Sequence, residues 1–346
     1  MSIKEAIAKI AGGSALEMGE ASDAMEEIVH GLATPAQIAA FAMALRMKGE
    51  TAPEIAGLAK VMRQEALPVK VSGDVVDTCG TGGDGLSTFN ISTIAAFVAS
   101  GAGARVAKHG NRAYTSSCGS ADLLEALGVA IELRPDEVAD CVDKVGIGFM
   151  FAPIFHPAMK HAAGPRKEIG VRTVFNVLGP LTNPAGASRQ LLGVATASLA
   201  PVMGDVLELL GCQRAMVVHG QEGMDEVSLS GPTRIREVSN GSSRSYDLYP
   251  ESLGFTRQPL EALKGGNAQQ NAEIAEAVLR GEPGPRRDVV LLNAAAALYA
   301  AGKAESLQEG VEMATTSIDS GAAAEKLRDL RSLSQSMKES KVSHVS

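Results

Sequence analysis

Apolar residues recur every three or four positions from the start of the chain to about Gln64, which is the spacing of one face of a helix. Ile3, Ile7 and Ile10 form the first such face. The segment Ser2–Glu5 before it has the spacing of a capping box, in which a serine and a glutamate close the first turn of a helix. The pattern therefore predicts a helix in this first segment.

Thr34–Gln37 repeats the capping-box spacing and places a proline at the first helical position. Gly49 ends this second pattern, as Gly12 and Gly13 end the first. The apolar positions of the second helix and of the one after it are Ile38, Phe41, Ala42, Leu45, Ile55, Leu58, Ala59 and Met62. We therefore expect a helical domain without strands over residues 1–70.

From Val71 onward, short β-like runs alternate with helical patterns, which is typical of a parallel sheet flanked by helices. The expected strands include Arg105–Ala107, Val129–Leu133, Gln190–Ala195 and Ala215–His219. The expected helices between them are Ala121–Leu127, Asp136–Val145 and Leu199–Leu210. Glu226–Ser230 and Arg234–Val238 predict a hairpin or edge pair. The chain from Ala268 onward should be mostly helical, and the tail after Leu333 should fray.

The apolar run Val75–Cys79 leads into a stretch that is rich in glycine. Gly80–Gly85 holds four glycines in six residues, which lets main-chain N–H groups approach an anion without side chains in the way. A helical pattern follows, and Asn90, Ser92 or Thr93 stands where its N-cap is expected. A phosphate would then meet glycine amides, cap hydroxyls and the positive end of a helix together.

Two other phosphate-binding motifs fail here on spacing. Gly80, Gly82 and Gly85 satisfy G-x-G-x-x-G. A dinucleotide site also needs an acidic residue about 20 residues further on, and the segment Arg105–His109 has none. A P-loop needs lysine where this chain has Leu86. A glycine-rich turn without a ligand is the plain alternative.

A basic segment follows the next short strand. Lys108–Arg112 brings two cations and an amide to the end of Arg105–Ala107, and hydroxyl groups follow at Thr115–Ser117 and Ser120. Ligands of open α/β sheets bind at the strand ends, so this segment suits a polyanion with a neighbouring polar group. A solvated loop is the plain alternative.

Composition narrows the class of protein. The chain has 346 residues, 45% of them hydrophobic and 21% charged, so it is an ordinary globular protein with room for one large domain or two smaller ones. The net charge of −8 argues against a nucleic-acid-binding surface. Cys79, Cys118, Cys141 and Cys212 lack C-x-x-C spacing, which favours reduced thiols in the cytoplasm. No leader pattern and no run of about 18 apolar residues is present, so we expect neither secretion nor a membrane span.

The runs Asp77–Thr93 and Lys108–Ser120 together resemble the signature of the anthranilate phosphoribosyltransferase family. Gly164–Arg166, Arg172–Pro184 and the pair Asp225-Glu226 continue the resemblance in the same order along nearly the whole chain. It implies an α/β protein of nucleoside phosphorylase-like phosphoribosyltransferase fold. A small N-terminal all-helical domain, residues 1–70 with helices near 160–182, would join a larger α/β domain, residues 71–346, whose mostly parallel sheet is flanked by helices.

The resemblance also implies an activity. The family transfers the phosphoribosyl group from 5-phosphoribosyl 1-pyrophosphate to anthranilate, in tryptophan biosynthesis, and it uses Mg²⁺. The implied assembly is a cytoplasmic homodimer. We expect these two small molecules as ligands, and we expect neither nucleic acid nor a membrane as a partner.

Residue by residue, the resemblance implies which positions bind each substrate. The residues implied for the phosphoribosyl donor are Gly80, Gly83, Asp84, Thr88, Asn90, Ile91, Ser92, Thr93, Lys108, His109, Gly110, Asn111, Arg112, Ala113, Tyr114, Thr115, Ser116 and Ser120. Those implied for anthranilate are Gly80, Asn111 and Arg166, and those implied for the metal are Ser92, Asp225 and Glu226. No dedicated general base is evident, and His109 is a candidate for orienting anthranilate.

The residue types suit these roles. Phe149–Pro153 offers an apolar wall for an aromatic ring, and the Arg166 guanidinium offers a partner for a carboxylate. The plain alternative is ordinary core with an ion pair between Arg166 and Glu168. Asp225 and Glu226 offer the hard oxygen ligands that Mg²⁺ prefers. Neighbouring side chains on a regular strand point to opposite faces, so both carboxylates reach one metal only if the chain bends there, and otherwise they lie in a solvated loop.

Two other functions remain open. One is a pyrimidine nucleoside phosphorylase-like enzyme of related fold, against which Arg166 and the run Arg172–Pro184 argue. The other is a non-catalytic relative that binds nucleic acid, which would need a basic groove on a chain that is acidic overall.

Overall fold

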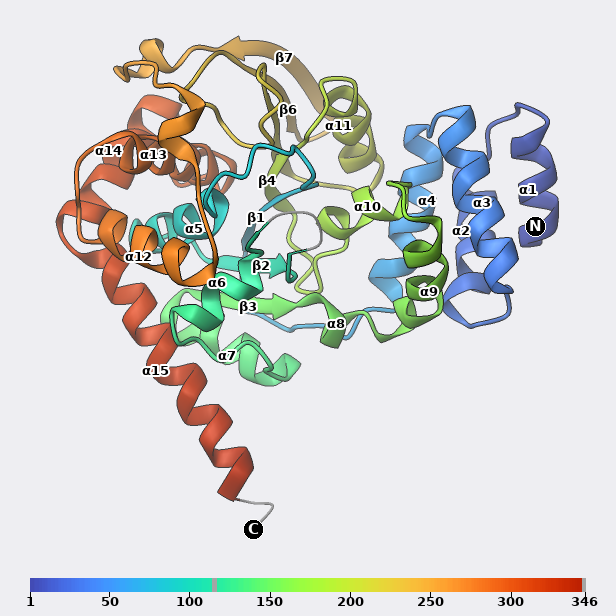
Figure 1. The fold of residues 1–346 in the computed structure, drawn as a ribbon, viewed down its shortest axis with the longest axis horizontal. Helices are drawn as coiled ribbons and strands as arrows, with labels where there is room; N and C mark the ends of the chain where they lie inside the picture. Colours follow the sequence, from blue (N-terminus) through green and yellow to red (C-terminus); the bar gives the residue numbers. More distant parts are fainter. Residues whose placement is uncertain (114–116, 344–346) are drawn as a thin grey trace.

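The computed structural model describes residues 1–113 and 117–343 and has two regions that lie side by side (Figure 1). The first region consists of helices α1 (Ile3–Ala11), α2 (Met18–Val29), α3 (Pro35–Lys48) and α4 (Ala52–Gln64). The second contains a seven-stranded sheet with helices on both faces. The expected fold class, a small helical region beside a larger α/β region, is confirmed.

The helix boundaries in the first region follow from local signals. The Ser2 hydroxyl accepts a hydrogen bond from the Glu5 N–H, and the Glu5 carboxylate accepts one from the Ser2 N–H, so the predicted capping box forms. Thr34 caps α3 in the same way, with proline at the first helical position. Gly49 ends α3 with φ 90°, a backbone conformation that favours glycine.

The sheet has the strand order β3-β2-β1-β4-β5-β6-β7. Its strands are β1 (Val76–Gly80), β2 (Val106–Gly110), β3 (Ile147–Phe151), β4 (Arg189–Gly193), β5 (Arg214–Gly220), β6 (Thr233–Ser239) and β7 (Ser242–Leu248). β1 to β5 are parallel, whereas β6 and β7 are antiparallel to their neighbours. The carboxyl ends of the central strands β1 and β2 therefore lie beside each other, which is where ligands bind in such sheets.

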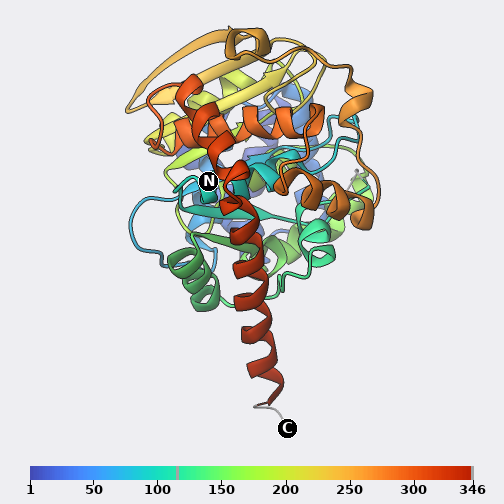
Figure 2. The same ribbon diagram turned by 90° about the vertical axis from the view of Figure 1, so that its left-hand side faces the viewer.

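Helices cover both faces of the sheet (Figures 1 and 2). Their bounds are α5 (Ile91–Gly101), α6 (Ser120–Ala126), α7 (Pro135–Val145), α8 (Ala152–Phe155), α9 (Lys160–Ile169), α10 (Phe175–Leu178), α11 (Leu199–Leu209), α12 (Ala268–Leu279), α13 (Pro285–Ala300), α14 (Leu307–Asp319) and α15 (Ala322–Ser343). α5 and α13 pack on one face of the sheet, and α11 packs between the other face and α4. α9 packs against α2 and α3. None of the helices in the described ranges has the length and apolarity needed to cross a membrane.

Adjacent residues of the central strands supply two separate cores. Leu191 belongs to the core under α5 and α13, whereas Leu192 belongs to the core shared by the helical region and α11. Ala215 and Met216 of β5 divide between the two cores in the same way. Because successive strand residues point to opposite faces, this alternation ties the helical region to the sheet.

Val129–Leu133 is not a strand, which corrects the prediction made for it. Its apolar side chains are buried, as the pattern indicated. Its backbone, however, bonds to helices: the Ala130 N–H donates to the hydroxyl of Ser334 in α15 at 3.1 Å. The third strand of the sheet is instead Ile147–Phe151, which the sequence analysis treated as part of an apolar wall.

Three further predictions need correction. Glu226–Ser230 is not a strand, and β6 pairs with the serine-rich β7, whose polar composition hid the strand. Lys108 and His109 lie within β2 rather than beyond its end. The segment after Leu333 continues α15 to Ser343, and Figure 2 shows this helix extending beyond the body of the molecule.

Candidate active site

The loop that follows β1 needs glycine at two positions, because a side chain at either would collide with neighbouring residues. A Cβ at Gly80 would lie 2.4 Å from the Asp225 Oδ2, and one at Gly83 would lie 1.5 Å from the Arg172 Nη1. Gly83 also has φ 78°, which side chains rarely adopt. The Gly82 N–H donates to the Asp225 carboxylate at 2.8 Å. The loop backbone is therefore held against a carboxylate and a guanidinium.

The helix α5 starts at the other end of this loop. Asn90, one of the three residues that the sequence offered for it, occupies the N-cap position, but its side chain makes no capping hydrogen bond. The Ser92 N–H, in the first turn, donates to the Glu226 Oε1 at 3.1 Å. Ile91, by contrast, is fully buried in the core and does not line the cavity. The first turn of α5 thus presents polar groups to the cavity on one side only.

Lys108 places a cation at the base of the cavity. Its side chain is only 3% exposed, and its Nζ donates to the Thr78 carbonyl and lies 3.4 Å from the Ser92 hydroxyl oxygen. Burial lowers the pKa of Lys108, while the nearby Asp77 opposes that effect. Asp77 is itself buried, and it accepts a hydrogen bond from the Asn183 Nδ2 at 2.7 Å.

Asp225 and Glu226 lie opposite the glycine loop. Burial, reinforced by the neighbouring Asp84 charge, raises the pKa of Asp225, and burial with the Asp225 charge raises the pKa of Glu226. The Asp84 Oδ2 is buried without a hydrogen-bond partner. The chain bends at this point rather than forming a strand, so both carboxylates reach one cavity.

This set of oxygens suits a hard divalent cation. Such an ion would offset the charge repulsion that raises these pKa values and would give the unpartnered Asp84 oxygen a partner. Among the described residues, no three His, Cys, Asp or Glu side chains converge as a ready-made metal cluster. Mg²⁺ commonly takes one or two protein carboxylates and completes its shell with water and ligand phosphates.

These groups line one cavity of about 310 Å³, here termed the glycine-loop pocket. The residues predicted for the phosphoribosyl donor that line it are Gly80, Gly83, Asp84, Thr88, Asn90, Ser92, Thr93, Lys108, His109, Gly110, Asn111, Arg112, Ala113 and Ser120. Asp225 and Glu226 also line it. Tyr114, Thr115 and Ser116 lie outside the described residues.

A second cavity of about 500 Å³, here termed the Arg166 pocket, adjoins the first. It lies between the sheet and the helices α9 and α10, and the Arg166 guanidinium lies over the Phe175 ring at 5.8 Å from its centroid. Gly80 and Asn111 line both pockets. Of the predicted wall Phe149–Pro153, only Ala152 and Pro153 line the cavity, because the first three residues form β3.

Two buried histidines line the Arg166 pocket. The rings of His109 and His156 are 4.9 Å apart, and the Nε2 of each is buried without a partner. Burial and the adjacent histidine lower the pKa of His109 to about 3, and burial lowers the pKa of His156 to about 4. The His109 Nδ1 lies 3.2 Å from the Gly179 carbonyl, which fixes the proton on Nδ1 and leaves Nε2 as an acceptor.

Arg172 and Asn176 also line the glycine-loop pocket, although neither was predicted individually from the sequence. The Arg172 Nη2 donates to the Thr81 carbonyl at 3.0 Å, and its own carbonyl accepts a hydrogen bond from Arg46 of α3. Both residues belong to the run Arg172–Pro184, which was recognised only as a whole. The clash that a side chain at Gly83 would make with Arg172 can be recognised only from the folded structure.

Comparisons with known proteins agree with this architecture. Residues 72–324 match the model described as "Glycosyl transferase family, a/b domain", and residues 4–66 match "Glycosyl transferase family, helical bundle domain". The chain is 58% identical to the anthranilate phosphoribosyltransferase of Moorella thermoacetica, over 94% of this chain and 96% of that protein.

Solved structures give the same result. The anthranilate phosphoribosyltransferase of Thermus thermophilus superposes with a TM-score of 0.91 at 47% identity, covering 95% of this chain and 99% of that one. The enzyme from Saccharomyces cerevisiae in complex with PRPP and Mg superposes with a TM-score of 0.87 at 30% identity, covering 96% and 98%.

Proposed function

The chain belongs to the anthranilate phosphoribosyltransferase family, and we propose that its two adjoining pockets hold the two substrates of that reaction. The enzyme transfers the phosphoribosyl group from 5-phosphoribosyl 1-pyrophosphate to the amine of anthranilate, releasing pyrophosphate, as a step of tryptophan biosynthesis. Mg²⁺ is its cofactor. The relatives do not favour a nucleoside phosphorylase or a nucleic-acid-binding protein.

We assign the phosphoribosyl donor to the glycine-loop pocket. Its support is the convergence of glycine amides, the positive end of α5 and the buried Lys108, which together suit a polyanion. Asp225, Glu226 and Ser92 would hold Mg²⁺, with Asp84 beside them. When bound, the ion neutralises the charge that pyrophosphate carries away. Tyr114, Thr115 and Ser116 stay in the proposed donor site on the family resemblance alone.

We assign anthranilate to the Arg166 pocket. An aromatic acid needs an apolar cavity and a cation for its carboxylate, and this pocket combines apolar side chains with the Arg166 guanidinium. Asn111 lies on the boundary, where its side chain is within reach of both substrates. The amine of anthranilate would then face the donor across Gly80.

The geometry favours catalysis by positioning rather than by a strong base. A histidine whose pKa is about 3 is a poor proton acceptor at neutral pH, so His109 would orient the aromatic amine as part of the pocket wall rather than take its proton. The glycine loop and Lys108 would hold the leaving group while the amine approaches the anomeric carbon. Among the described residues, we identify no dedicated general base.

One observation carries this proposal: two cavities of different chemistry meet at Gly80 and Asn111. The test is the decay of anthranilate fluorescence with purified protein. We expect decay only when the phosphoribosyl donor and Mg²⁺ are both present. Decay without the donor, or none under any condition, would contradict the proposal.

The proposal extends to the domain boundary at residue 70 and to a homodimer in the cytoplasm. In the helical region, Leu32 is 73% exposed and Met47 is 80% exposed, which leaves apolar surface for a second copy. The four cysteines are free thiols, as expected for a reducing compartment. Sedimentation at micromolar concentration should give about twice 35.7 kDa, and a species of only that mass would exclude the dimer.

A further inference from the structure

A segment that is distant in the sequence contacts Ser87–Asn90, which links the glycine loop to α5. Leu263–Gly266, hereafter the strap, runs beside Ser87–Asn90. The Phe89 N–H donates to the first carbonyl of the strap at 3.2 Å, and the Gly265 N–H donates to the Ser87 carbonyl at 2.9 Å. A Cβ at Gly265 would lie 2.7 Å from the Phe89 Cα, so the two backbones are in direct contact.

Asn271, near the start of α12, joins the strap to the beginning of α5. Its side chain is only 2% exposed. The Asn271 Oδ1 accepts the Gly266 N–H at 2.7 Å, and its Nδ2 donates to the Asn90 Oδ1 at 2.9 Å. The Asn90 Nδ2 in turn donates to the Cys118 carbonyl at 3.0 Å. These bonds fix the Asn90 amide, with its oxygen toward α12 and its nitrogen toward the segment after β2.

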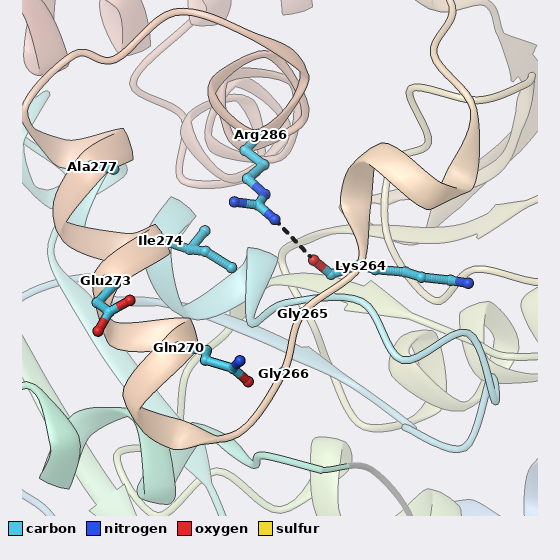
Figure 3. A pocket seen from close by; sticks show the side chains of 8 residues that line it. All are labelled: Lys264, Gly265, Gly266, Gln270, Glu273, Ile274, Ala277 and Arg286. Atoms are coloured by element: carbon cyan, nitrogen blue, oxygen red, sulfur yellow. Dashed lines mark hydrogen bonds between the residues drawn. The ribbon is translucent and has the colours of Figure 1, made fainter.

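The strap leads directly into α12 and packs against side chains of its first turn. Figure 3 shows the strap passing beside α12, with Arg286 of α13 reaching the Lys264 carbonyl at 3.3 Å. A cavity of about 310 Å³ lies beside the strap and α12, but the Gln270 side chain reaches the strap, because a Cβ at Gly266 would lie 2.0 Å from the Gln270 Oε1. The Asn271 amide differs from the other strap contacts of α12 because it also reaches Asn90. A buried amide is costly unless its polar atoms are bonded, and those of Asn271 bond to parts of the donor loop and its support.

We propose that Asn271 is a positioning residue for the phosphoribosyl donor. Asn271 does not line the glycine-loop pocket. It acts through Asn90, whose amide it orients, and through the strap, which holds the backbone of Ser87–Asn90. The inference rests on the proposed assignment of the donor to this pocket.

Asn271→Ala tests the inference. Loss of a bond that orients a binding group should weaken donor affinity about three- to tenfold, measured by calorimetry with the donor and Mg²⁺. The KM for anthranilate at saturating donor should stay within twofold of the parent value. Asn271→Asp keeps the acceptor for the Gly266 N–H but turns a second oxygen toward the Asn90 Oδ1. Its donor affinity should therefore fall at least as far, and parent-like affinity in either variant would overturn the inference.

A matched control separates this effect from a general loss of stability in α12. Asn267 caps the same helix by accepting the Gln270 N–H at 3.0 Å, and in the described part of the chain no hydrogen bond joins it to Asn90. Asn267→Ala should lower the thermal midpoint while keeping parent donor affinity. If it weakens donor binding as much as Asn271→Ala does, the role of Asn271 is only structural.

Asn90→Ala distinguishes this inference from the function on which it rests. If Asn90→Ala leaves donor affinity unchanged, the assignment of the donor to this pocket is wrong. If Asn90→Ala weakens binding and adding Asn271→Ala weakens it no further, the two residues act as a unit, as proposed. Independent, additive losses would overturn the positioning role while leaving the donor assignment intact.

Discussion

The glycine-loop pocket and the Arg166 pocket share Gly80, His109 and Asn111, yet each also has buried ionisable groups that the other lacks. In the first, burial raises the pKa of the carboxyl of Glu226, and in the second it lowers the pKa of His156. Burial favours the neutral form in both cases. The two pockets differ in what can restore the charge. A divalent cation can reverse the shift in the first pocket, whereas the two histidines of the second stay neutral beside apolar side chains that suit an aromatic ring.

The largest effect should come from removing the carboxylates of the glycine-loop pocket. Asp225→Asn combined with Glu226→Gln removes two negative charges while keeping approximate shape. Without a metal, simple electrostatics would make donor binding tighter. With Mg²⁺ held here, we expect weaker Mg²⁺-dependent donor binding and a fall in turnover of about a hundredfold or more.

The measurement is donor affinity and turnover across a Mg²⁺ titration for the parent and the double variant. Substitution at Glu168, outside both pockets, serves as a charge control. A double variant with the parent's Mg²⁺ dependence would show that these carboxylates do not hold the ion.

A smaller effect should show that the two pockets bind different substrates. Arg166 lines only the Arg166 pocket, so Arg166→Ala should raise the KM for anthranilate about tenfold or more and leave donor affinity near the parent value. Asn111 lines both pockets, so Asn111→Ala should impair the use of both substrates. Calorimetry with the donor alone, together with steady-state kinetics, checks both expectations. Equal loss of donor affinity in the two variants would remove the distinction between the pockets.

The sequence predicted the features that depend on neighbouring residues. The capping box at Ser2 and the glycine loop at Gly80–Gly85 are local patterns, and both appear where expected. Val129–Leu133 has the apolar pattern of a strand, but its backbone bonds to Ser334, about 200 residues away along the chain, and not to a neighbouring strand. Local patterns carry no information about such distant partners.

The same limit applies to the candidate site. Most of the residues that the resemblance implies for the donor line the glycine-loop pocket, although the Ile91 side chain lies in the core. The sequence did not predict contacts between distant segments. Examples are the hydrogen bond from the Asn271 amide to Asn90 and the position of the Arg172 guanidinium beside Gly83. Each of these depends on the folded backbone bringing together segments that lie far apart in sequence.

The pH dependence of stability offers a third test of the comparison. An unfolded His156 takes up a proton near pH 6.5, whereas the folded one does so only near pH 4, so its contribution to stability is lost as pH falls between these values. Glu226 has the opposite sign: its folded pKa is about 8, so its contribution is lost as pH rises toward that value.

His156→Gln should therefore lose about 2 kcal/mol less stability than the parent between pH 7 and pH 5. Urea unfolding at the two pH values measures the difference. Identical acid sensitivity in the parent and His156→Gln would show that the buried imidazole does not resist protonation.

The smallest effect should appear at Ile91, which lies at the boundary between the glycine-loop pocket and the core. The resemblance placed Ile91 among the donor-binding residues, but the structure buries its side chain completely, beside the polar first turn of α5. Ile91→Val removes one buried methyl group and should lower the free energy of unfolding by about 1 kcal/mol. Donor affinity should stay at the parent value, because any contact from this position to the donor is made by the backbone. Thr93→Val, on the same turn and lining the pocket, is the paired variant and should weaken donor binding with little change in stability. Calorimetry and urea unfolding of both variants check this division. If Ile91→Val loses more donor affinity than Thr93→Val does, the Ile91 side chain belongs to the glycine-loop pocket and not to the core.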